Sequence, residues 1–377
     1  MANRYPVVLV HGMFGWGPSE LGGFPYWGMG VVVPCPMKRL LASVGPISSA
    51  HDRACELAYQ LKGGQVDYGA EHAATAGHER YGKTYDQGLY PIWSDDDPVH
   101  LVGHSMGGPT VWMLQHLLDI DYFGWGSNAN WVRSISVISG AMNGSTVVYF
   151  LGLNERTGLL EDDSVGGYLV SALELYTAAT GTLFDAFYDF DLDHWGFVRG
   201  PDEGLGDYLA RISHSPMFRG TDNGAYGVSL QGMYEQNALC STHPKTHYFS
   251  YVTEQTFEGF LTGYHRPEPR MNPFIIPTSV YIGQKRFDEP PYPGFEAEPW
   301  WPNDGLISTF SQQYPRSAGA HVGVEGISAR CEYEPGVWHY ETLEGVDHID
   351  IVALPQFDQI GFQKRFYTGL YNRLAAL

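Results

Sequence analysis

Apolar residues gather in short unbroken runs along the first third of the chain and recur at helical spacing between those runs. Residues 6–10 form an unbroken run typical of a strand that is buried on both faces of a sheet, and residues 98–102 and 134–139 are also strand-like. Residues 52–61 and 111–118 place apolar side chains at helical spacing. Strands that alternate with helices predict an α/β fold with a mostly parallel central sheet.

The second half of the chain is less regular. Residues 247–252 and 337–340 predict two further strands, and residues 357–377 carry the apolar stripe of a closing helix. Residues 143–237 have a largely helical pattern, and about 95 residues are far more than an ordinary connection needs. We predict that this segment is an inserted cap or lid, with an ordinary helical layer of the fold as the alternative. Residues 37–41 also have a helical pattern, although little chain remains there for both a helix and a strand.

The acidic composition narrows the choice of partners. The 377 residues are enough for one large domain over 1–377, and they carry a formal net charge of -20. This charge repels nucleic acid and anionic membranes, so neither is an expected partner. No apolar run approaches the roughly 20 residues of a transmembrane segment, and the chain begins without a signal-peptide pattern. We expect either a cytoplasmic protein or the mature form of an exported one.

The four cysteines, Cys35, Cys55, Cys240 and Cys331, are widely separated and form no C-x-x-C pair. Their spacing gives no metal cluster. It admits one disulfide as well as buried free thiols.

One pentapeptide carries the clearest chemical signal. Gly103-His104-Ser105-Met106-Gly107 follows the strand-like run 98–102 and precedes the helix-like run 111–118. Strand, tight turn and helix are the context in which G-x-S-x-G presents a serine nucleophile. We expect a strained backbone at Ser105 and flanking glycines at which a side chain would clash. A turn whose serine merely caps a helix is the plain structural alternative.

A serine hydroxyl becomes a good nucleophile only when a base removes its proton. In an α/β-hydrolase the acid and then the histidine follow the serine along the chain. Asp304, in an Asn-Asp-Gly turn, and His348, before the closing helix, have this order. His339 competes as the base but lies in a predicted strand, and Asp347 competes as the acid although adjacent side chains usually point apart. We therefore predict Ser105, Asp304 and His348 as a catalytic triad.

A glycine-rich segment, residues 11–17, follows the first predicted strand. Glycines at this place let backbone N–H groups face a ligand. In α/β-hydrolases such a loop supplies one N–H group of the oxyanion hole, and the residue after the nucleophile supplies the other. We assign these two groups to Met13 and Met106.

Several stretches, spread over nearly the whole chain, match one known family: residues 8–17, 24–28, 44–49, 52–56, 66–78, 188–196, 261–263, 303–305 and 346–348. In these stretches the chain resembles the thermoalkalophilic bacterial lipases (lipase family I.5), which are related to the staphylococcal lipases. The resemblance implies an α/β-hydrolase fold with a helical lid over 143–237, a small zinc-binding insertion over 50–95, and the triad named above.

For the metal, the resemblance implies Asp52, His72, His78 and Asp193 as zinc ligands. Two carboxylates and two neutral imidazoles satisfy tetrahedral Zn²⁺, and four protein ligands leave no open position. The zinc is therefore expected to be structural. It would tie the segment 50–95, which is poor in core residues, to the chain near the fourth ligand.

The chain departs from the family pattern at both of the family's metal sites. His51 stands where these lipases have Trp beside the zinc. At the family's calcium site, Asp350 can stand for one acidic ligand, but Leu354-Pro355 replaces the Asp-Pro that supplies two more. One carboxylate is too few for Ca²⁺, which takes about six or more oxygen ligands, so we expect weak or absent calcium binding.

These expectations describe a secreted, extracellular serine carboxylester hydrolase. Its substrate would be an acylglycerol at a lipid–water interface, which makes it a triacylglycerol lipase or lipase-like esterase. The nearest alternative is an esterase on short-chain esters or synthetic aliphatic–aromatic polyesters. The non-enzymatic alternative is a zinc-dependent binding module on a hydrolase scaffold.

Overall fold

A seven-stranded sheet forms the centre of the molecule. The computed structural model describes residues 3–19, 23, 25–161, 164–170, 190–316, 322–330, 332–352 and 359–377. The strand order is β10-β11-β7-β6-β5-β1-β2, and each neighbouring pair is parallel. The predicted α/β fold with a mostly parallel sheet is therefore confirmed. The strands of this sheet are β1 (Val7–Val10), β2 (Arg39–Leu41), β5 (Val99–His104), β6 (Val132–Ile138), β7 (His247–Glu254), β10 (Gly323–Glu325) and β11 (Trp338–Glu344).

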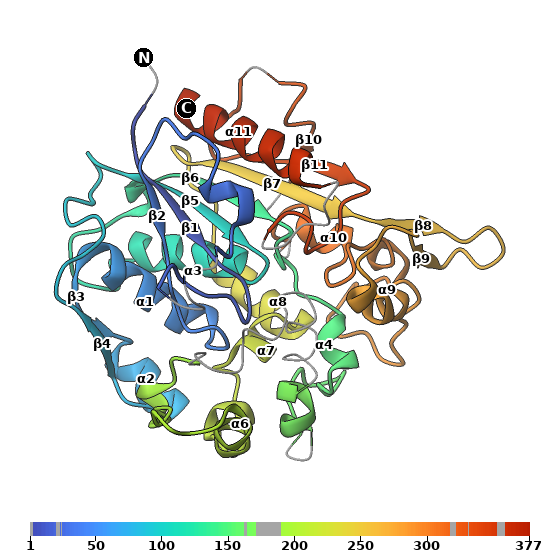
Figure 1. Ribbon diagram of the computed structural model, residues 1–377, viewed down its shortest axis with the longest axis horizontal. Helices are drawn as coiled ribbons and strands as arrows, with labels where there is room; N and C mark the ends of the chain where they lie inside the picture. Colours follow the sequence, from blue (N-terminus) through green and yellow to red (C-terminus); the bar gives the residue numbers. More distant parts are fainter. Residues whose placement is uncertain are drawn as a thin grey trace.

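Two small antiparallel hairpins and a set of helices surround the sheet (Figure 1). The hairpins are β3 (Gly64–Asp67) with β4 (Tyr81–Tyr85), and β8 (Thr256–Glu258) with β9 (His265–Pro267). The α-helices are α1 (Ala50–Lys62), α2 (Ala70–Ala76), α3 (Gly107–Asp119), α4 (Val147–Phe150), α6 (Leu205–Ile212), α7 (Gly224–Gly227), α8 (Leu230–Leu239), α9 (Ile276–Ile282), α10 (Thr309–Gln312) and α11 (Ile360–Ala376). The 3-10 helices are η2 (Gly28–Val31), η3 (Ala129–Trp131), η5 (Asp193–Trp195), η6 (Pro216–Arg219), η7 (Pro273–Ile275) and η8 (Glu298–Trp300).

Helices cover both faces of the sheet because both faces are apolar. Successive side chains of a strand point to opposite faces, so Val7 and Leu9 of β1 lie on one side and Val8 and Val10 on the other. Val8 and Val10 belong to the apolar cluster that contains α1 and α3 residues. Val7 and Leu9 belong to the cluster that contains α11 residues. A strand buried in this way has no polar alternation, which is the pattern that residues 6–10 show.

The long elements follow the periodicity of the sequence. The predicted strands at 6–10, 98–102, 134–139, 247–252 and 337–340 correspond to β1, β5, β6, β7 and β11, and the predicted helices correspond to α1, α3 and α11. In α11 the buried stripe consists of Gln363, Tyr367, Leu370, Tyr371, Leu374 and Ala375.

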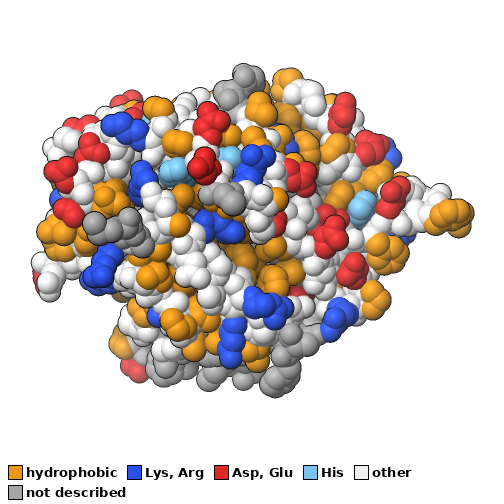
Figure 2. All heavy atoms as spheres, turned by 90° about the horizontal axis from the view of Figure 1, so that it is seen from above, with side chains coloured by type: hydrophobic (Ala, Val, Ile, Leu, Met, Phe, Trp, Pro, Cys, Tyr) orange, Lys and Arg blue, Asp and Glu red, His pale blue; other side chains and the backbone are white. Residues whose placement is uncertain are grey.

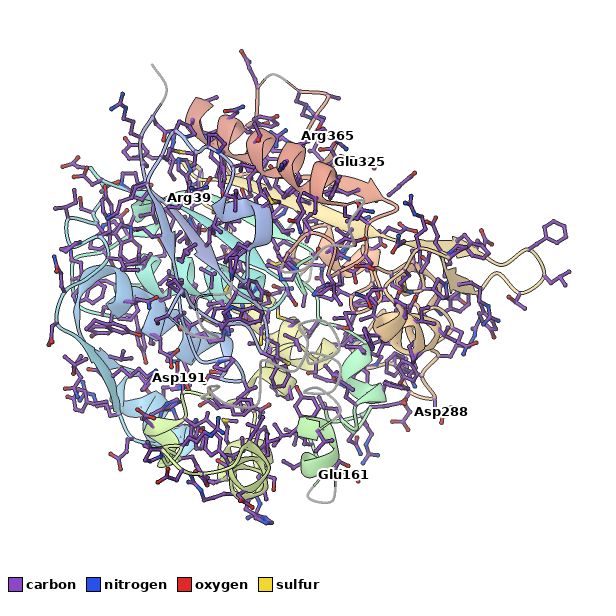
Figure 3. All side chains as sticks on the ribbon, viewed as in Figure 1. Arg39, Glu161, Asp191, Asp288, Glu325 and Arg365 are labelled. Atoms are coloured by element: carbon purple, nitrogen blue, oxygen red, sulfur yellow. The ribbon has the colours of Figure 1, made fainter. Side chains whose placement is uncertain are left out.

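The prediction of a helix at residues 37–41 is wrong. Arg39–Leu41 is strand β2, which pairs with β1 at the edge of the sheet. The Arg39 guanidinium, labelled in Figure 3, donates to the carbonyl groups of Gly30 and Val33 and lies over the Tyr371 ring. These tertiary contacts favour an extended backbone over the local helical preference.

The two segments predicted as insertions have defined structure where the chain is described. Residues 50–95 contain α1 and the two-stranded sheet of β3 and β4, with α2 between its strands. Between 143 and 237 the described residues contain α4, η5, α6, η6, α7 and α8, whereas residues 162–163 and 171–189 lie outside the described part. Within the described residues, every helix is too short or too polar to cross a lipid bilayer.

Candidate active site and metal centre

Ser105 lies on a tight turn between the end of β5 and the start of α3. Its φ is +56°, in the left-handed region that side chains rarely adopt. A Cβ at Gly103 would lie 2.3 Å from the Gly107 carbonyl oxygen, and a Cβ at Gly107 would lie 2.2 Å from the Val10 carbonyl oxygen. The predicted backbone strain and the predicted clashes are therefore present. The turn can form only with glycine at both flanking positions.

The structure brings Asp304 and His348 together as predicted. The His348 Nδ1 atom lies 2.8 Å from Asp304 Oδ2, and both side chains are buried. The same carboxylate oxygen accepts hydrogen bonds from Thr253 Oγ1 at 2.7 Å and from Gln312 Nε2 at 3.1 Å. Asp304 Oδ1 accepts two backbone N–H groups of its own turn at 3.0 and 2.8 Å. This set of donors holds the carboxylate in one orientation towards the imidazole.

The competing residues serve other contacts. Asp347 Oδ1 accepts the backbone N–H groups of Ile349 and Asp350, each at 2.9 Å, and Oδ2 accepts the N–H of Asn272 at 2.7 Å. Burial raises the pKa of Asp347. His339 lies on β11, and its Nε2 atom is 3.4 Å from a backbone carbonyl oxygen five residues earlier. The geometry thus favours the Asp304–His348 pair.

Ser105 and His348 line the same cavity. Met13 and Met106 line it as well, and among the described residues no protein acceptor receives a hydrogen bond from either backbone N–H group. The remaining lining is mostly apolar and includes Trp16, Val148, Leu151, Val228, Ile275 and Leu306. A polar pair at the wall of an apolar cavity is the usual form of an enzyme site for an apolar substrate.

A buried chain of hydrogen bonds connects the loop of Met13 to the loop of His348. The Gly12 backbone N–H donates to the Tyr26 hydroxyl oxygen at 2.9 Å. Tyr26 Oη lies 2.7 Å from His104 Nδ1, and His104 Nε2 lies 3.3 Å from the His348 carbonyl oxygen. A carbonyl can only accept, so His104 carries its proton on Nε2 and the tyrosine hydroxyl donates to Nδ1. The chain therefore has one direction, from the hydroxyl to the imidazole to the His348 carbonyl.

Burial keeps this chain uncharged. It lowers the pKa of His104 well below its ordinary value, and the neighbouring His348 lowers it further. Burial also raises the pKa of Tyr26 above its ordinary value, so the hydroxyl keeps its proton. Sequence reasoning assigned neither residue a role, because His104 occupies the variable position of the pentapeptide and Tyr26 lies far away in sequence.

A second cluster of polar residues lies away from this cavity. Asp52 of α1, His72 of α2, His78 just after α2 and Asp222 just before α7 each turn one ligand atom towards the others, and these atoms lie within 4.8 Å of one another. His72 Nε2 is 3.0 Å from Asp52 Oδ1 and 3.4 Å from Asp222 Oδ1. His78 Nε2 is 3.3 Å from Asp222 Oδ2 and 3.8 Å from Asp52 Oδ2. Metal bonds of about 2.0–2.1 Å at tetrahedral angles separate ligand atoms by about 3.3 Å, so the cluster has the size of a metal site.

Unsatisfied atoms in the cluster also fit a metal ion. His78 Nε2 and Asp222 Oδ2 are buried and have no hydrogen-bond partner among the described residues. Burial acts to lower the pKa of His72, but the hydrogen bonds that His72 donates to Asp222 and Asp52 outweigh burial and raise its pKa to about 10. The two carboxylates therefore require positive charge between them, which a divalent cation supplies.

The prediction of Asp193 as the fourth ligand is wrong, because Asp222 completes the cluster. Asp193 is exposed on η5, whereas its neighbour His194 is buried with Nε2 3.2 Å from Asp52 Oδ2. An ion pair between Asp191, labelled in Figure 3, and Lys83 joins this segment to β4. His194 thus contacts Asp52 from outside the group of four converging ligand atoms. Only the tight Thr-Asp-Asn-Gly turn before α7 marked Asp222 in the sequence, and it carries no metal-specific spacing.

His51, which departs from the family pattern, stacks on His72 of the cluster. Its ring lies 3.7 Å from the His72 ring between centroids, at an interplanar angle of 24°.

At the family's calcium position, Asp350 Oδ2 accepts the Asp347 backbone N–H at 3.3 Å. Residues 354–355 lie outside the described part, so weak calcium binding stays a prediction. Cys35, Cys55 and Cys240 are free thiols within the described residues, which do not include Cys331.

The fold and the serine turn define an α/β-hydrolase, and comparison with known proteins narrows this class. The chain belongs to the family described as "Lipase-like, C-terminal domain", whose model matches residues 3–376. It is 32% identical over 403 residues to Lipase 2 of Staphylococcus aureus, covering 99% of this chain and 54% of that protein. The chain thus spans about half the length of the curated relatives it matches.

Solved structures agree with this assignment. EstA from Clostridium botulinum superimposes with a TM-score of 0.80 and 31% identity, covering 100% of this chain and 88% of that chain. The lipase of Staphylococcus hyicus superimposes with a TM-score of 0.76 and 32% identity, covering 99% and 96%. At these identities and coverages the similarity extends over the whole chain rather than one motif.

The corrected ligand set gives a matched pair of variants. Asp222→Ala should lose its bound metal on desalting and lower the free energy of unfolding by about 3 kcal/mol or more, because the two imidazoles and the remaining carboxylate no longer complete the site. Asp193→Ala should retain the metal and unfold like the wild type, because Asp193 is exposed. Elemental analysis and thermal unfolding measure both effects. Metal loss in Asp193→Ala with retention in Asp222→Ala would restore the original assignment.

Proposed function

We propose that this chain is a serine carboxylester hydrolase. The observation that carries the proposal is the 2.8 Å contact between His348 and Asp304 in a cavity that Ser105 also lines. In this mechanism His348 removes the proton of Ser105, whose oxygen attacks the ester carbonyl. Asp304 holds the imidazole in the correct tautomer and stabilises the imidazolium that forms.

The oxyanion of the tetrahedral intermediate would be bound by the backbone N–H groups of Met13 and Met106. Arg53 supports the first of these loops, since its buried guanidinium donates to the His11 carbonyl at 2.5 Å and to the Gly45 carbonyl at 2.7 Å. Collapse of the intermediate releases the alcohol, which takes the proton from His348, and leaves an acyl group on Ser105. Water then repeats the sequence and frees the acid.

The substrate we propose is an acylglycerol or another long-chain ester, so the protein is a triacylglycerol lipase or lipase-like esterase. The apolar lining of the cavity supports an acyl chain as its occupant, and relatives over the same length carry the name lipase. Aromatic side chains in the same lining, those of Phe14, Trp16, Tyr26 and Tyr168, favour a second candidate. Such rings could stack on aryl groups of an aliphatic–aromatic polyester.

We also propose that the metal is Zn²⁺ with a structural role. Four protein ligands, two of them imidazoles, suit zinc and leave no position for substrate. The sections 50–95 and 143–237 would then be a zinc-binding insertion and a lid, joined through Asp222.

We further propose that the protein works outside the cell, where a surface of strongly negative net charge favours solubility.

Removing the nucleophile tests the reaction. Ser105→Ala should lower kcat on a soluble p-nitrophenyl ester by about 10⁴-fold or more, because the remaining groups cannot form the acyl-enzyme. Ser145→Ala is the matched control, since Ser145 lines the same cavity but donates to the Leu306 carbonyl. Equal turnover by Ser105→Ala and wild type, with intact circular dichroism, would exclude the assignment.

The Tyr26 hydroxyl offers a test of loop positioning. Tyr26→Phe leaves the Gly12 N–H and His104 Nδ1 without their partner, and we expect kcat to fall about tenfold while KM stays nearly constant. Tyr168→Phe is the control, because its hydroxyl donates to the Met13 sulfur at 3.2 Å and lies outside the Tyr26–His104 chain. A larger loss in Tyr168→Phe than in Tyr26→Phe contradicts a positioning role for the chain.

An ester series separates the two substrate candidates. A lipase should hydrolyse triolein emulsions and should gain rate when an ester passes its solubility limit, because a lid opens at the lipid surface. An esterase should prefer dissolved short-chain esters and show no gain. Release of acid from a polyester film, measured by chromatography, decides the polyester candidate.

A further inference from the structure

The β8–β9 hairpin projects from the body of the molecule and ends in apolar side chains. We call residues 259–264 the hairpin tip. Phe260 is 100% exposed and Leu261 is 91% exposed, the two highest values among the large apolar side chains of the described residues. Figure 1 shows the hairpin extending beyond all neighbouring elements, and Figure 2 shows its end as a hydrophobic projection. Soluble proteins rarely leave such side chains together in water without a use for them.

Hydrogen bonds give the hairpin tip a defined shape. The Gly259 N–H donates to the Tyr264 carbonyl at 2.8 Å, and the Gly263 N–H donates back to the Gly259 carbonyl at 2.9 Å. Gly263 has a φ of +69°, which closes the turn. At the base, the His265 N–H donates to the Gly283 carbonyl at the end of α9 at 2.8 Å. The tip therefore holds its two apolar side chains outwards on a fixed stem.

The hairpin leaves the sheet at the carboxyl ends of the strands, where the candidate active site lies. β8 begins two residues after β7 ends, and Thr253 near the end of β7 donates to Asp304. The stem also pairs with the Asp304 loop, because the Gln255 N–H donates to the Asn303 carbonyl and the Asn303 N–H to Thr256 Oγ1.

The neighbouring elements continue this apolar surface to the cavity. α9 packs against both β9 and α4. On η7, before α9, Ile275 lines the cavity while Phe274 is 52% exposed. At α4, Leu151 lines the cavity while Phe150 is 49% exposed. Apolar side chains thus face outwards directly behind the cavity wall, on the side of the molecule that carries the hairpin.

Charge and area favour one occupant. The tip has no Asp, Glu, Lys, Arg or His between Glu258 and His265, and the chain carries a net charge of -20, which opposes an anionic bilayer. Two side chains of about 200 Å² each fall well short of the roughly 800 Å² per partner that a stable protein interface buries. Insertion of apolar side chains into an uncharged lipid surface meets no charge repulsion and does not require so large a buried area.

We propose that the hairpin tip is an interfacial anchor, which inserts Phe260 and Leu261 into a neutral lipid surface and holds the cavity beside it. The proposal rests on the proposed function for the identity of that surface, the ester substrate itself. It adds a fixed binding element to the lipase hypothesis, separate from any movement of residues 143–237.

The test compares two double variants with the wild type. Phe260→Ser with Leu261→Ser removes the anchor. Ile92→Ser with Ile120→Ser is the control, because these residues are 60% and 54% exposed. They lie towards the amino ends of the strands, away from the hairpin, since Ile92 precedes β5 and Ile120 follows α3. Binding is measured by flotation with phosphatidylcholine vesicles and with vesicles that also contain phosphatidylglycerol. Turnover is measured on triolein emulsion and on a dissolved p-nitrophenyl ester.

We expect the tip variant to bind phosphatidylcholine vesicles about tenfold more weakly or worse, since two apolar side chains lose their burial in lipid. Its rate on emulsion should fall in parallel, while its kcat/KM on dissolved ester and its thermal unfolding match the wild type. Wild-type binding should weaken when phosphatidylglycerol is added.

Three outcomes would overturn the proposal. The first is equal vesicle binding by the tip variant and wild type. The second is an equal loss in the Ile92/Ile120 control. The third is a wild-type dimer in size-exclusion chromatography that the tip variant alone dissociates, which assigns the surface to a second copy. If wild type hydrolyses no ester, the proposed function fails, while the vesicle binding ratio still decides the anchor.

Discussion

Close backbone packing at the serine turn is the constraint on which the rest of the site depends. Gly103 and Gly107 let the end of β5, the start of α3 and the Val10 carbonyl approach to distances that no side chain would permit. A Cβ at Gly12 would lie 2.7 Å from Ser105 Cβ, so the glycine-rich loop after β1 meets the turn in the same way. This packing places the Met13 and Met106 amides on one cavity. Ser105 can hold its unfavourable backbone because the surrounding sheet and helix leave it no alternative.

Because the strands are parallel, the remaining chemical groups lie at the same carboxyl ends of the strands. The end of β7 supplies Thr253 to orient Asp304, and the segment after β11 supplies His348. The His104–Tyr26 hydrogen bond then ties the His348 segment to the loop after β1, across three strands of the sheet. Each group is held by a network in which all the polar partners are buried, which fixes geometry more firmly than any single pair could. The hairpin that continues β7 leaves the sheet at these carboxyl ends too.

The metal cluster joins parts of the chain that the sheet does not organise. Asp52 comes from α1, His72 and His78 come from the short segment between α1 and β4, and Asp222 comes from the region predicted as a lid. The Gly224 N–H, two residues on, donates to the Ile47 carbonyl just before α1 and anchors the same junction. An ion at this place would fix one end of α7 and α8 against the hydrolase core.

The sequence by itself determined the parallel sheet, the serine turn and the order Ser105, Asp304, His348, because these depend on local periodicity, on glycine and on chain order. Three of the four metal-cluster residues were also predictable, through the resemblance to a family. The fourth was not, because a 3-10 turn buries His194 and exposes Asp193, while Asp222 reaches the cluster from 29 residues further on. Strand β2 was mistaken for a helix because its partner β1 lies about 30 residues earlier. The chain of hydrogen bonds through Tyr26 likewise arises from contacts between segments that are distant in sequence. Phe260 is exposed because no distant segment packs against it among the described residues. Only the tertiary structure decides these, since local pattern carries no information about which distant groups share a buried space.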